Sequence, residues 1–174
     1  MAEAAADLVT LLRRAAERFD ASPFLSVGDQ RATFTEFAAA AARMAKALRA
    51  AGLAPLDRVA LLLHRSIDEA VALFATLLAG GVAVPIHGKL KDDQVAHVLA
   101  DAEPFAVITS SVRRLALRAD AATLAGRRVF VCDRGWPEPR DEQFLAADAP
   151  NGRTPAVLLY TSGSTGRAKG IVQD

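Results

Sequence analysis

The chain has 174 residues, 52% of them hydrophobic, so it can form a globular domain with a sizeable core and is not a disordered protein. Its 21 basic and 20 acidic residues give a net charge of +1, which offers no global attraction for nucleic acid or for an anionic membrane. Cys132 is the single cysteine. It cannot form a disulfide within the chain, and a reducing, cytoplasmic location is expected.

The first 34 residues predict a helix followed by a small antiparallel hairpin. Apolar residues recur at helical spacing near the N-terminus, which is typical of an amphipathic helix: Leu8, Leu11, Leu12, Ala15 and Phe19. Residues 24–27 and 32–34 are two short strand candidates, and residues 28–30 between them favour a three-residue hairpin loop.

Two helices and one strand are predicted next. Thr33 and Glu36 have the spacing of a capping box, and the alanine-rich segment after them predicts a helix over 36–51 that ends at Gly52. Residues 59–63 form an apolar run typical of a strand buried on both faces. The capping-box spacing recurs at Ser66 and Glu69, and their helix is predicted to end at the glycine pair 80–81.

Strands and helices continue to alternate up to residue 132. The pattern predicts a strand at 82–86, a surface helix at 92–101, a strand at 105–109, a helix at 112–124 and a fourth buried strand at 128–132. Such alternation indicates an α/β fold, with a mostly parallel sheet that carries helices on both faces. The longest uncharged run, 70–88, is broken by two glycines and a proline, so we expect a helix and a strand there rather than a membrane span.

The most informative stretch follows an irregular, proline-containing connection at 133–155, within which a short helix at 142–147 is predicted. Residues 156–159 predict a buried strand, and the loop after them has the sequence YTSGSTGRAKG, from Tyr160 to Gly170. Glycines allow a positive φ and close approach to a ligand, while hydroxyls and cations can bind phosphate oxygens. The loop supplies all three kinds of group: Gly163, Gly166 and Gly170; Thr161, Ser162, Ser164 and Thr165; Arg167 and Lys169.

This stretch does not match the nucleoside-triphosphate loop G-x-x-x-x-G-K-[ST], because Ala168 and Gly170 occupy positions that require glycine and a hydroxyl. It resembles instead the signature Y-T-S-G-[ST]-T-G-x-P-K-G of the adenylate-forming (AMP-binding) superfamily, which includes acyl-CoA synthetases, nonribosomal-peptide adenylation domains and luciferases. Ala168 replaces the usual proline, a change that removes no phosphate donor.

The resemblance extends from about Leu8 to the last residue. Residues 32–37 are similar to the family's L-T-Y-x-E-L, residues 77–86 to its L-x-A-G-x-x-x-V-P-[LI], and residues 52–63 to its G-x-x-x-G-D-R-V-A-[LI]-L-L, with Leu56 in place of the usual glycine. It implies that residues 1–174 are the N-terminal subdomain of an adenylate-forming enzyme, truncated just after the phosphate-binding loop.

The resemblance also implies a reaction. A carboxylate attacks the α-phosphate of ATP to give an acyl-adenylate, and a thiol of coenzyme A or of phosphopantetheine then captures the acyl group. Lys169 and Thr161 would orient the phosphates catalytically. The triphosphate would be bound by Thr161, Ser162, Gly163, Ser164, Thr165, Gly166 and Lys169, with Mg²⁺ ligands expected outside this chain. Residues 84–95 favour an acyl-CoA ligase, and the fragment alone is expected to be inactive and to self-associate through exposed apolar surface.

Other interpretations remain open. The loop can belong to a self-contained, non-catalytic nucleotide- or phosphate-binding module, or it can be a flexible turn; further family motifs downstream in the parent reading frame would favour the enzyme. No spacing predicts a metal site. His64 and His87 are expected to be turn residues after strands, and Cys132 a buried structural thiol. The basic cluster is expected to be a solvated helix face rather than a nucleic-acid site: Arg113, Arg114, Arg118, Arg127 and Arg128.

Overall fold

The architecture comes from a computed structural model that describes residues 8–116, 124, 126–134, 155–161 and 169–173. Its helices are α1 (Leu8–Phe19), α2 (Phe34–Ala50), α3 (Ile67–Leu78), α4 (Asp92–Ala102) and α5 (Ser111–Ala116), with a short 3₁₀ helix η1 (Cys132–Arg134). Its strands are β1 (Pro23–Val27), β2 (Gln30–Thr33), β3 (Arg58–Leu62), β4 (Val82–Pro85), β5 (Ala106–Thr109), β6 (Arg128–Val131), β7 (Val157–Thr161) and β8 (Lys169–Gln173).

The strands form two sheets, as the sequence predicts. Strands β1 and β2 pair as a separate antiparallel hairpin, and the other strands form a sheet in the order β6-β5-β3-β4-β7-β8. All its neighbours are parallel except β7 and β8, which are antiparallel. The mostly parallel α/β sheet is thus confirmed, while the antiparallel edge strand β8 was not predicted.

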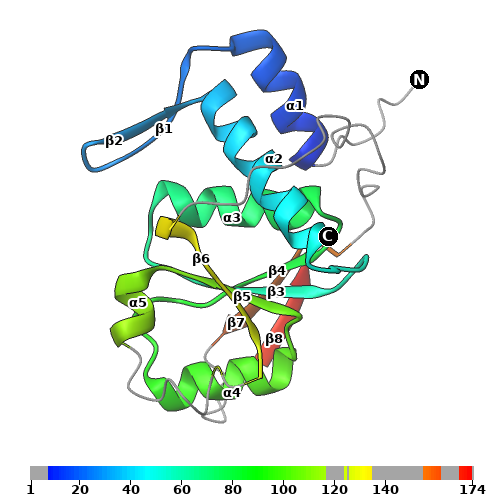
Figure 1. Cartoon of the computed structure of the whole chain (residues 1–174), viewed down its shortest axis with the longest axis vertical. Helices are drawn as coiled ribbons and strands as arrows, with labels where there is room; N and C mark the ends of the chain where they lie inside the picture. Colours follow the sequence, from blue (N-terminus) through cyan, green and yellow to red (C-terminus); the bar gives the residue numbers. More distant parts are fainter. Residues whose placement is uncertain (1–7, 117–123, 125, 135–154, 162–168, 174) are drawn as a thin grey trace.

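Helices cover both faces of the sheet because side chains alternate along its central strands. On β3, Val59 and Leu61 belong to a cluster with α2 and α3, whereas Ala60 and Leu62 belong to a cluster with α4. All four side chains are fully buried. Figure 1 shows the same layers, with α2 and α3 above the sheet and α4 below it.

Helix α2 begins at the predicted capping box. The Glu36 backbone N–H donates to Thr33 Oγ1 at 3.2 Å, and the Thr33 backbone N–H donates to Glu36 Oε2 at 2.9 Å. These bonds to the backbone and side chain of Thr33 lower the pKa of Glu36. Ser66 caps α3 in a similar way, because its Oγ accepts from the Glu69 N–H at 3.1 Å. Both predicted helix starts are therefore confirmed.

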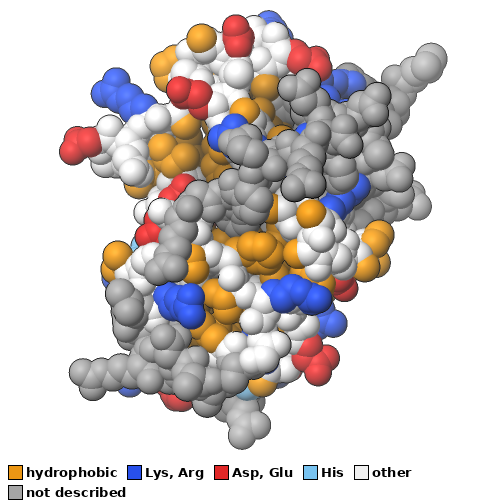
Figure 2. Space-filling model, in the orientation of Figure 1, with side chains coloured by type: hydrophobic (Ala, Val, Ile, Leu, Met, Phe, Trp, Pro, Cys, Tyr) orange, Lys and Arg blue, Asp and Glu red, His pale blue; other side chains and the backbone are white. Residues whose placement is uncertain are grey.

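Aromatic rings attach the hairpin to α2. The Phe24 ring centroid lies 4.4 Å from that of Phe34 and 4.8 Å from that of Phe37, whose side chain is buried. Figure 2 shows hydrophobic side chains gathered in this region, between the hairpin and the helices. The hairpin is thus held by side-chain packing, since its two strands hydrogen-bond only to each other within the described sheets.

Several predicted boundaries differ from the structure. The hairpin loop is shorter than expected, because Gln30 already pairs with Val27, and Phe34 begins α2 rather than ending a strand. The prediction of a fourth buried strand at 128–132 is wrong in part. β6 is an edge strand with half-buried residues, and Cys132 lies in η1. The run at 156–159 is also half-buried rather than buried, as β7.

Two predicted helices cannot be compared along their whole length. For the helix predicted at 112–124, α5 accounts for the first residues, and residues 117–123 lie outside the described part. The helix predicted at 142–147 lies entirely outside it.

The backbone at Leu56 has a conformation that favours glycine, the residue usual at this position in the family that the sequence resembles. Its φ is +67°, in the left-handed region that β-carbon sterics disfavour, and its side chain is 51% exposed. We expect Leu56→Gly to raise the free energy of unfolding by about 1 kcal/mol. This is the net of two effects, because glycine relieves the backbone strain but loses more conformational entropy on folding. Urea denaturation measures this change. Leu56→Ala keeps the strained backbone and should give no gain, so equal stabilisation by both variants would contradict a backbone cause.

Candidate functional site

The phosphate-binding motif begins on one strand and ends on another. Thr161 is the last residue of β7, Lys169 is the first residue of β8, and the two are paired across the strands. The predicted strand before the motif is confirmed as β7, but the predicted loop over 160–170 is wrong at both ends, because Tyr160 and Thr161 complete β7 and Lys169 and Gly170 begin β8. The predicted phosphate ligands between these two residues lie outside the described residues: Ser162, Gly163, Ser164, Thr165 and Gly166.

The described ends of the motif carry the chemistry of an anion site. Thr161 and Lys169 are both exposed, and their pairing holds their Cα atoms about 5 Å apart, the spacing of opposed residues in antiparallel strands. A hydroxyl that donates a hydrogen bond and an ammonium group with three donors therefore stand at the same end of the hairpin. This pair suits a ligand with several anionic oxygens, such as a polyphosphate.

Gly170 has a different role from the one predicted for it. Described glycines with a positive φ are Gly28, Gly52, Gly80 and Gly126, so Gly170 is not one of them, and it lies in regular β8 opposite Tyr160. A Cβ at Gly170 would lie 3.0 Å from Leu158 Cδ1 and 3.4 Å from Tyr160 Cζ. The prediction of a positive φ is wrong here, because the glycine is required by the cross-strand packing of β7 side chains.

Tyr160 makes a contact that the sequence did not reveal. Its hydroxyl donates to Asp101 Oδ2, on α4, at 2.5 Å. Burial, together with the hydrogen bond and the negative charge of Asp101, raises the pKa of Tyr160 far above its ordinary value. A half-buried tyrosine is expected to bond to some acceptor. Only the fold identifies it, since Asp101 is far from Tyr160 along the chain.

The histidines lie where the sequence placed them. His64 and His87 follow β3 and β4, and both side chains are exposed. The Nδ1 atom of His87 accepts a hydrogen bond from the Lys89 N–H at 3.2 Å, which fits a turn residue. Within the part of the chain that the structure describes, no three His, Cys, Asp or Glu side chains come together as a metal site would require.

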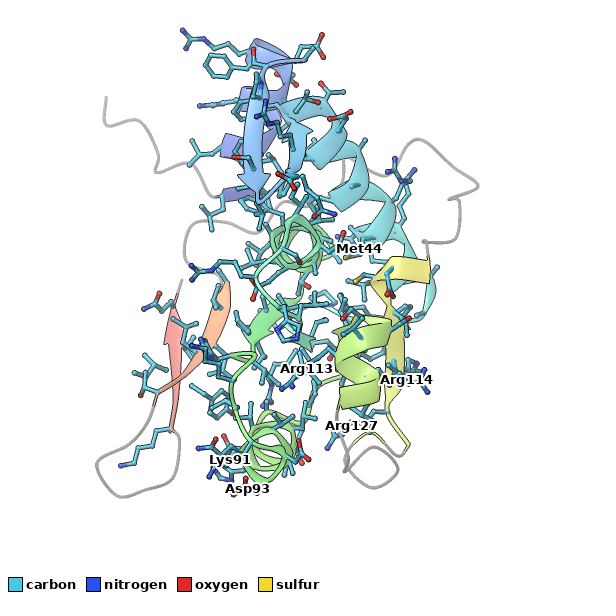
Figure 3. The ribbon with its side chains drawn as sticks, turned by 90° about the vertical axis from the view of Figure 1, so that its left-hand side faces the viewer. Met44, Lys91, Asp93, Arg113, Arg114 and Arg127 are labelled. Atoms are coloured by element: carbon cyan, nitrogen blue, oxygen red, sulfur yellow. The ribbon has the colours of Figure 1, made fainter. Side chains whose placement is uncertain are left out.

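Arg113 contradicts the prediction of a solvated basic face. Its side chain is only 7% exposed, and its Nε and Nη2 atoms have no hydrogen-bond partner among the described residues. Figure 3 shows Arg113 on the inner side of α5 and Arg114 on the outer side. The Arg128 guanidinium stacks over the Phe105 ring at 4.4 Å. Arg118 lies outside the described residues. The basic cluster is therefore not one continuous surface.

The burial of Arg113 predicts a stabilising substitution. Replacing an incompletely paired buried charge with an apolar side chain of similar length removes its desolvation penalty, so Arg113→Met should raise the free energy of unfolding by about 2 kcal/mol. Urea denaturation measures the change. Arg114→Met, at the exposed neighbouring position, is the matched control and should change stability by less than about 0.5 kcal/mol. Destabilisation by Arg113→Met would show that the guanidinium is favourably bound.

Cys132 is buried, as predicted, and lies beside two acidic residues. Its Sγ is 3.9 Å from Asp68 Oδ2. Burial first, and then the negative charges of Asp68 and Asp133, raise the pKa of the thiol to about 11. The surroundings of Cys132 therefore disfavour the thiolate that a nucleophile or a redox sensor needs.

This pKa predicts a slow thiol. At pH 8 only about a thousandth of Cys132 is thiolate, compared with roughly a quarter for a thiol of ordinary pKa. We expect iodoacetamide to alkylate the native chain about a hundredfold more slowly than the urea-unfolded chain at pH 8. Because the raised pKa keeps the thiol protonated, the native rate should rise with pH up to about 11. Equal native and unfolded rates would contradict the burial.

The fold is an α/β domain in which the hairpin of β7 and β8 carries the two ends of the motif predicted to bind phosphate, and comparison with known proteins gives its family. Residues 12–174 match the family of AMP-binding enzymes. The chain therefore belongs to the AMP-binding enzyme family, and the resemblance inferred from the sequence is confirmed.

Relatives and solved structures agree with this assignment. The chain is 34% identical over 170 residues to CymA of Salinispora arenicola, a probable non-canonical nonribosomal peptide synthetase, covering 98% of this chain and 2% of CymA. It matches the structure of the O-succinylbenzoate coenzyme A synthetase MenE from Bacillus subtilis in complex with AMP, with a TM-score of 0.74 and 26% identity over 93% of this chain and 41% of that one.

A second structure has a comparable fold. The N-terminal domain of FACL13 from Mycobacterium tuberculosis has a TM-score of 0.73 and 28% identity, over 95% of this chain and 43% of that one. The chain thus spans less than half the length of these structures and 11% or less of the relatives AmbB and CymA. Among the described helices, none has the length and hydrophobicity needed to cross a membrane.

Proposed function

We propose that this chain is the N-terminal subdomain of an ATP-dependent ligase that activates a carboxylic acid as an acyl-adenylate. The observation that carries the proposal is the exposed pair Thr161 and Lys169, held at the two ends of the family's phosphate-binding motif by β7 and β8. The structure of MenE, a chain of similar fold, is a complex with AMP, which supports nucleotide use by this chain.

The chemistry explains the residue types. A carboxylate is a poor electrophile, so its oxygen attacks the α-phosphorus of ATP, the bond to the β-phosphate oxygen breaks, and pyrophosphate leaves with the negative charge. Lys169 is suited to bind the leaving pyrophosphate and Thr161 to donate to a phosphate oxygen, which orients the displacement and stabilises its charge. The mixed anhydride then reacts with a thiolate to give a thioester and AMP.

The proposed family cofactor Mg²⁺ supplies charge neutralisation when bound with ATP. The residues that the structure describes include no group of three metal-ligating side chains. We therefore assign no Mg²⁺ ligand to them, and the proposal for this chain concerns the binding of phosphate by Thr161, Lys169 and the motif between them.

The thiol acceptor is proposed to be the phosphopantetheine arm of either coenzyme A or a carrier protein. Residues 84–95 and the likeness to MenE, a coenzyme A synthetase, support an acyl-CoA ligase. The higher identity to CymA, a probable peptide synthetase, supports a carrier-bound acceptor. Both acceptors present the same thiol, so the activation step is common to the two.

Exchange of labelled pyrophosphate into ATP tests the activation step. The complete gene product is incubated with ATP and a panel of aliphatic, aromatic and amino acids, and at least one acid should support exchange. The isolated 174-residue chain is expected to show none. Coenzyme A and a phosphopantetheinylated carrier protein, added in turn to the acid that works, then identify the acceptor by thioester formation. ATP binding without exchange for any acid would favour the non-catalytic binding module instead.

Self-association of the chain is proposed from its exposed edge. Ile171 and Val172 on β8 are 49% and 61% exposed, and the outer side of this edge strand has no partner strand in the described sheet. Light scattering of the 174-residue chain should show a mass that increases with concentration, and a monomer throughout would argue against this proposal. A cytoplasmic location remains a prediction based on the single cysteine.

A further inference from the structure

Tyr160 lies immediately before the residue that begins the phosphate-binding loop. It is paired with Gly170, and the next pair along the hairpin is Thr161 with Lys169. The pair of Tyr160 and Gly170 is therefore directly adjacent to the pair of Thr161 and Lys169. A shift of Tyr160 or Gly170 would move the exposed side chains of Thr161 and Lys169 with it.

The Tyr160 ring is seated on β8. A Cβ at Gly170 would lie 3.4 Å from Tyr160 Cζ and 3.5 Å from its Oη, so the bare backbone of Gly170 forms the surface on which the end of the ring rests. A side chain there would have to displace the ring or separate the strands. Tyr160 thus sets how closely β8 approaches β7 at the mouth of the loop.

The Tyr160 hydroxyl also fixes the hairpin to the body of the domain. It donates to the carboxylate of Asp101 at 2.5 Å, and a hydrogen bond to an ionised acceptor is stronger than a neutral one. Leu158 and Tyr160 pack against the buried cluster that includes Val95, Val98 and Leu99 of α4. In contrast, β7 pairs with β4 at Ala83 and Val157, at the opposite end of β7.

We propose that Tyr160, held by Asp101 and seated on Gly170, is a positioning residue that fixes Thr161 and Lys169 for the triphosphate of ATP. Because successive side chains of a strand point to opposite faces, Tyr160 faces α4 while Thr161 stays exposed. This inference rests on the proposed function, since it assigns a role in the same site.

The test compares Tyr160→Phe, Asp101→Asn and the double variant. Phenylalanine keeps the ring on Gly170 and loses only the hydroxyl, and Asp101 is exposed, so both variants should fold. In pyrophosphate exchange by the complete gene product, each single variant should raise the KM for ATP about tenfold, with kcat reduced less than about threefold. The double variant should be no worse than either single one, because both remove the same bond. Asp93→Asn, an exposed carboxylate on α4, is the control and should leave the KM for ATP unchanged.

Amide hydrogen exchange gives a second readout that needs no ligand. In the 174-residue chain, Tyr160→Phe and Asp101→Asn should accelerate exchange of the β8 amides about tenfold and leave those of β3 unchanged. If the wild-type protein showed no pyrophosphate exchange, the proposed function would be refuted. Hydrogen exchange of the β8 amides alone would then decide whether Tyr160 positions the hairpin. Unchanged β8 exchange, an unchanged KM for ATP, or additive effects in the double variant would each overturn the proposal.

Discussion

Lys169→Ala is expected to lower kcat/KM for pyrophosphate exchange about a hundredfold, the loss typical of removing one preorganised group that stabilises developing charge. The leaving pyrophosphate gains negative charge in the displacement, and Lys169 is the cation at the described end of the motif. Because Lys169 is exposed, its removal should not lower the thermal midpoint of unfolding. The exchange rate at several ATP concentrations, measured with the complete gene product, gives both kcat and KM.

Two variants make this experiment specific. Lys89→Ala removes an exposed lysine outside the motif and should leave exchange unchanged. Lys169→Arg keeps the charge but replaces a compact ammonium with a planar guanidinium, so partial activity is expected. If Lys169→Ala exchanged pyrophosphate at the wild-type rate, the assignment of Lys169 to the phosphates would be wrong.

Gly81→Ala is expected to lower the free energy of unfolding by about 3 kcal/mol, because overpacking a buried site forces the backbone to shift. Its Cβ would lie 2.9 Å from the Asp57 carbonyl oxygen and 3.2 Å from both Leu53 Cδ2 and Thr76 Cγ2. The same carbonyl accepts the Val82 N–H at 2.9 Å, so relief of the clash would disturb the start of β4. Urea denaturation of the purified chain measures the loss.

Gly88 provides a matched control with the same nominal contact distance. A Cβ at Gly88 would also meet an atom at 2.9 Å, but that atom is Nδ1 of His64, an exposed side chain that can rotate away. Gly88→Ala should therefore change stability by less than about 0.5 kcal/mol. Equal losses in the two variants would show that the rigidity of the Asp57 backbone is not what makes Gly81 necessary.

Features that depend on local patterns could be predicted from the sequence. The capping pairs Thr33 with Glu36 and Ser66 with Glu69 follow from short spacings, and the apolar run at 59–63 indicated a strand buried on both faces. The phosphate-binding motif could be located for the same reason, because its residue types and their order are contiguous. The structure confirms the strand at its start, whereas the pairing of its end residues across β7 and β8 was not predicted.

Features that depend on distant contacts could not be predicted. The partner of the Tyr160 hydroxyl is chosen by the packing of α4 against β7, and the burial of Arg113 by the orientation of α5. Asp133 accepts hydrogen bonds from the backbone N–H and hydroxyl of Ser111, a cap supplied from η1 that no local spacing reveals. At Gly170 the composition indicated a flexible loop, whereas the structure shows that glycine is needed there because the side chains of the neighbouring strand pack closely against its backbone.

The strand order has a consequence for how the chain folds. Residues 63–81 separate β3 from its neighbour β4 and residues 63–105 separate it from its neighbour β5, whereas the longer segment 86–156 separates β4 from its neighbour β7. Loop-closure entropy therefore favours early assembly of the central strands with α3 and late docking of the β7–β8 hairpin. During synthesis the end of the domain that carries the predicted phosphate-binding motif is thus the last part to be completed, on a sheet that has already formed.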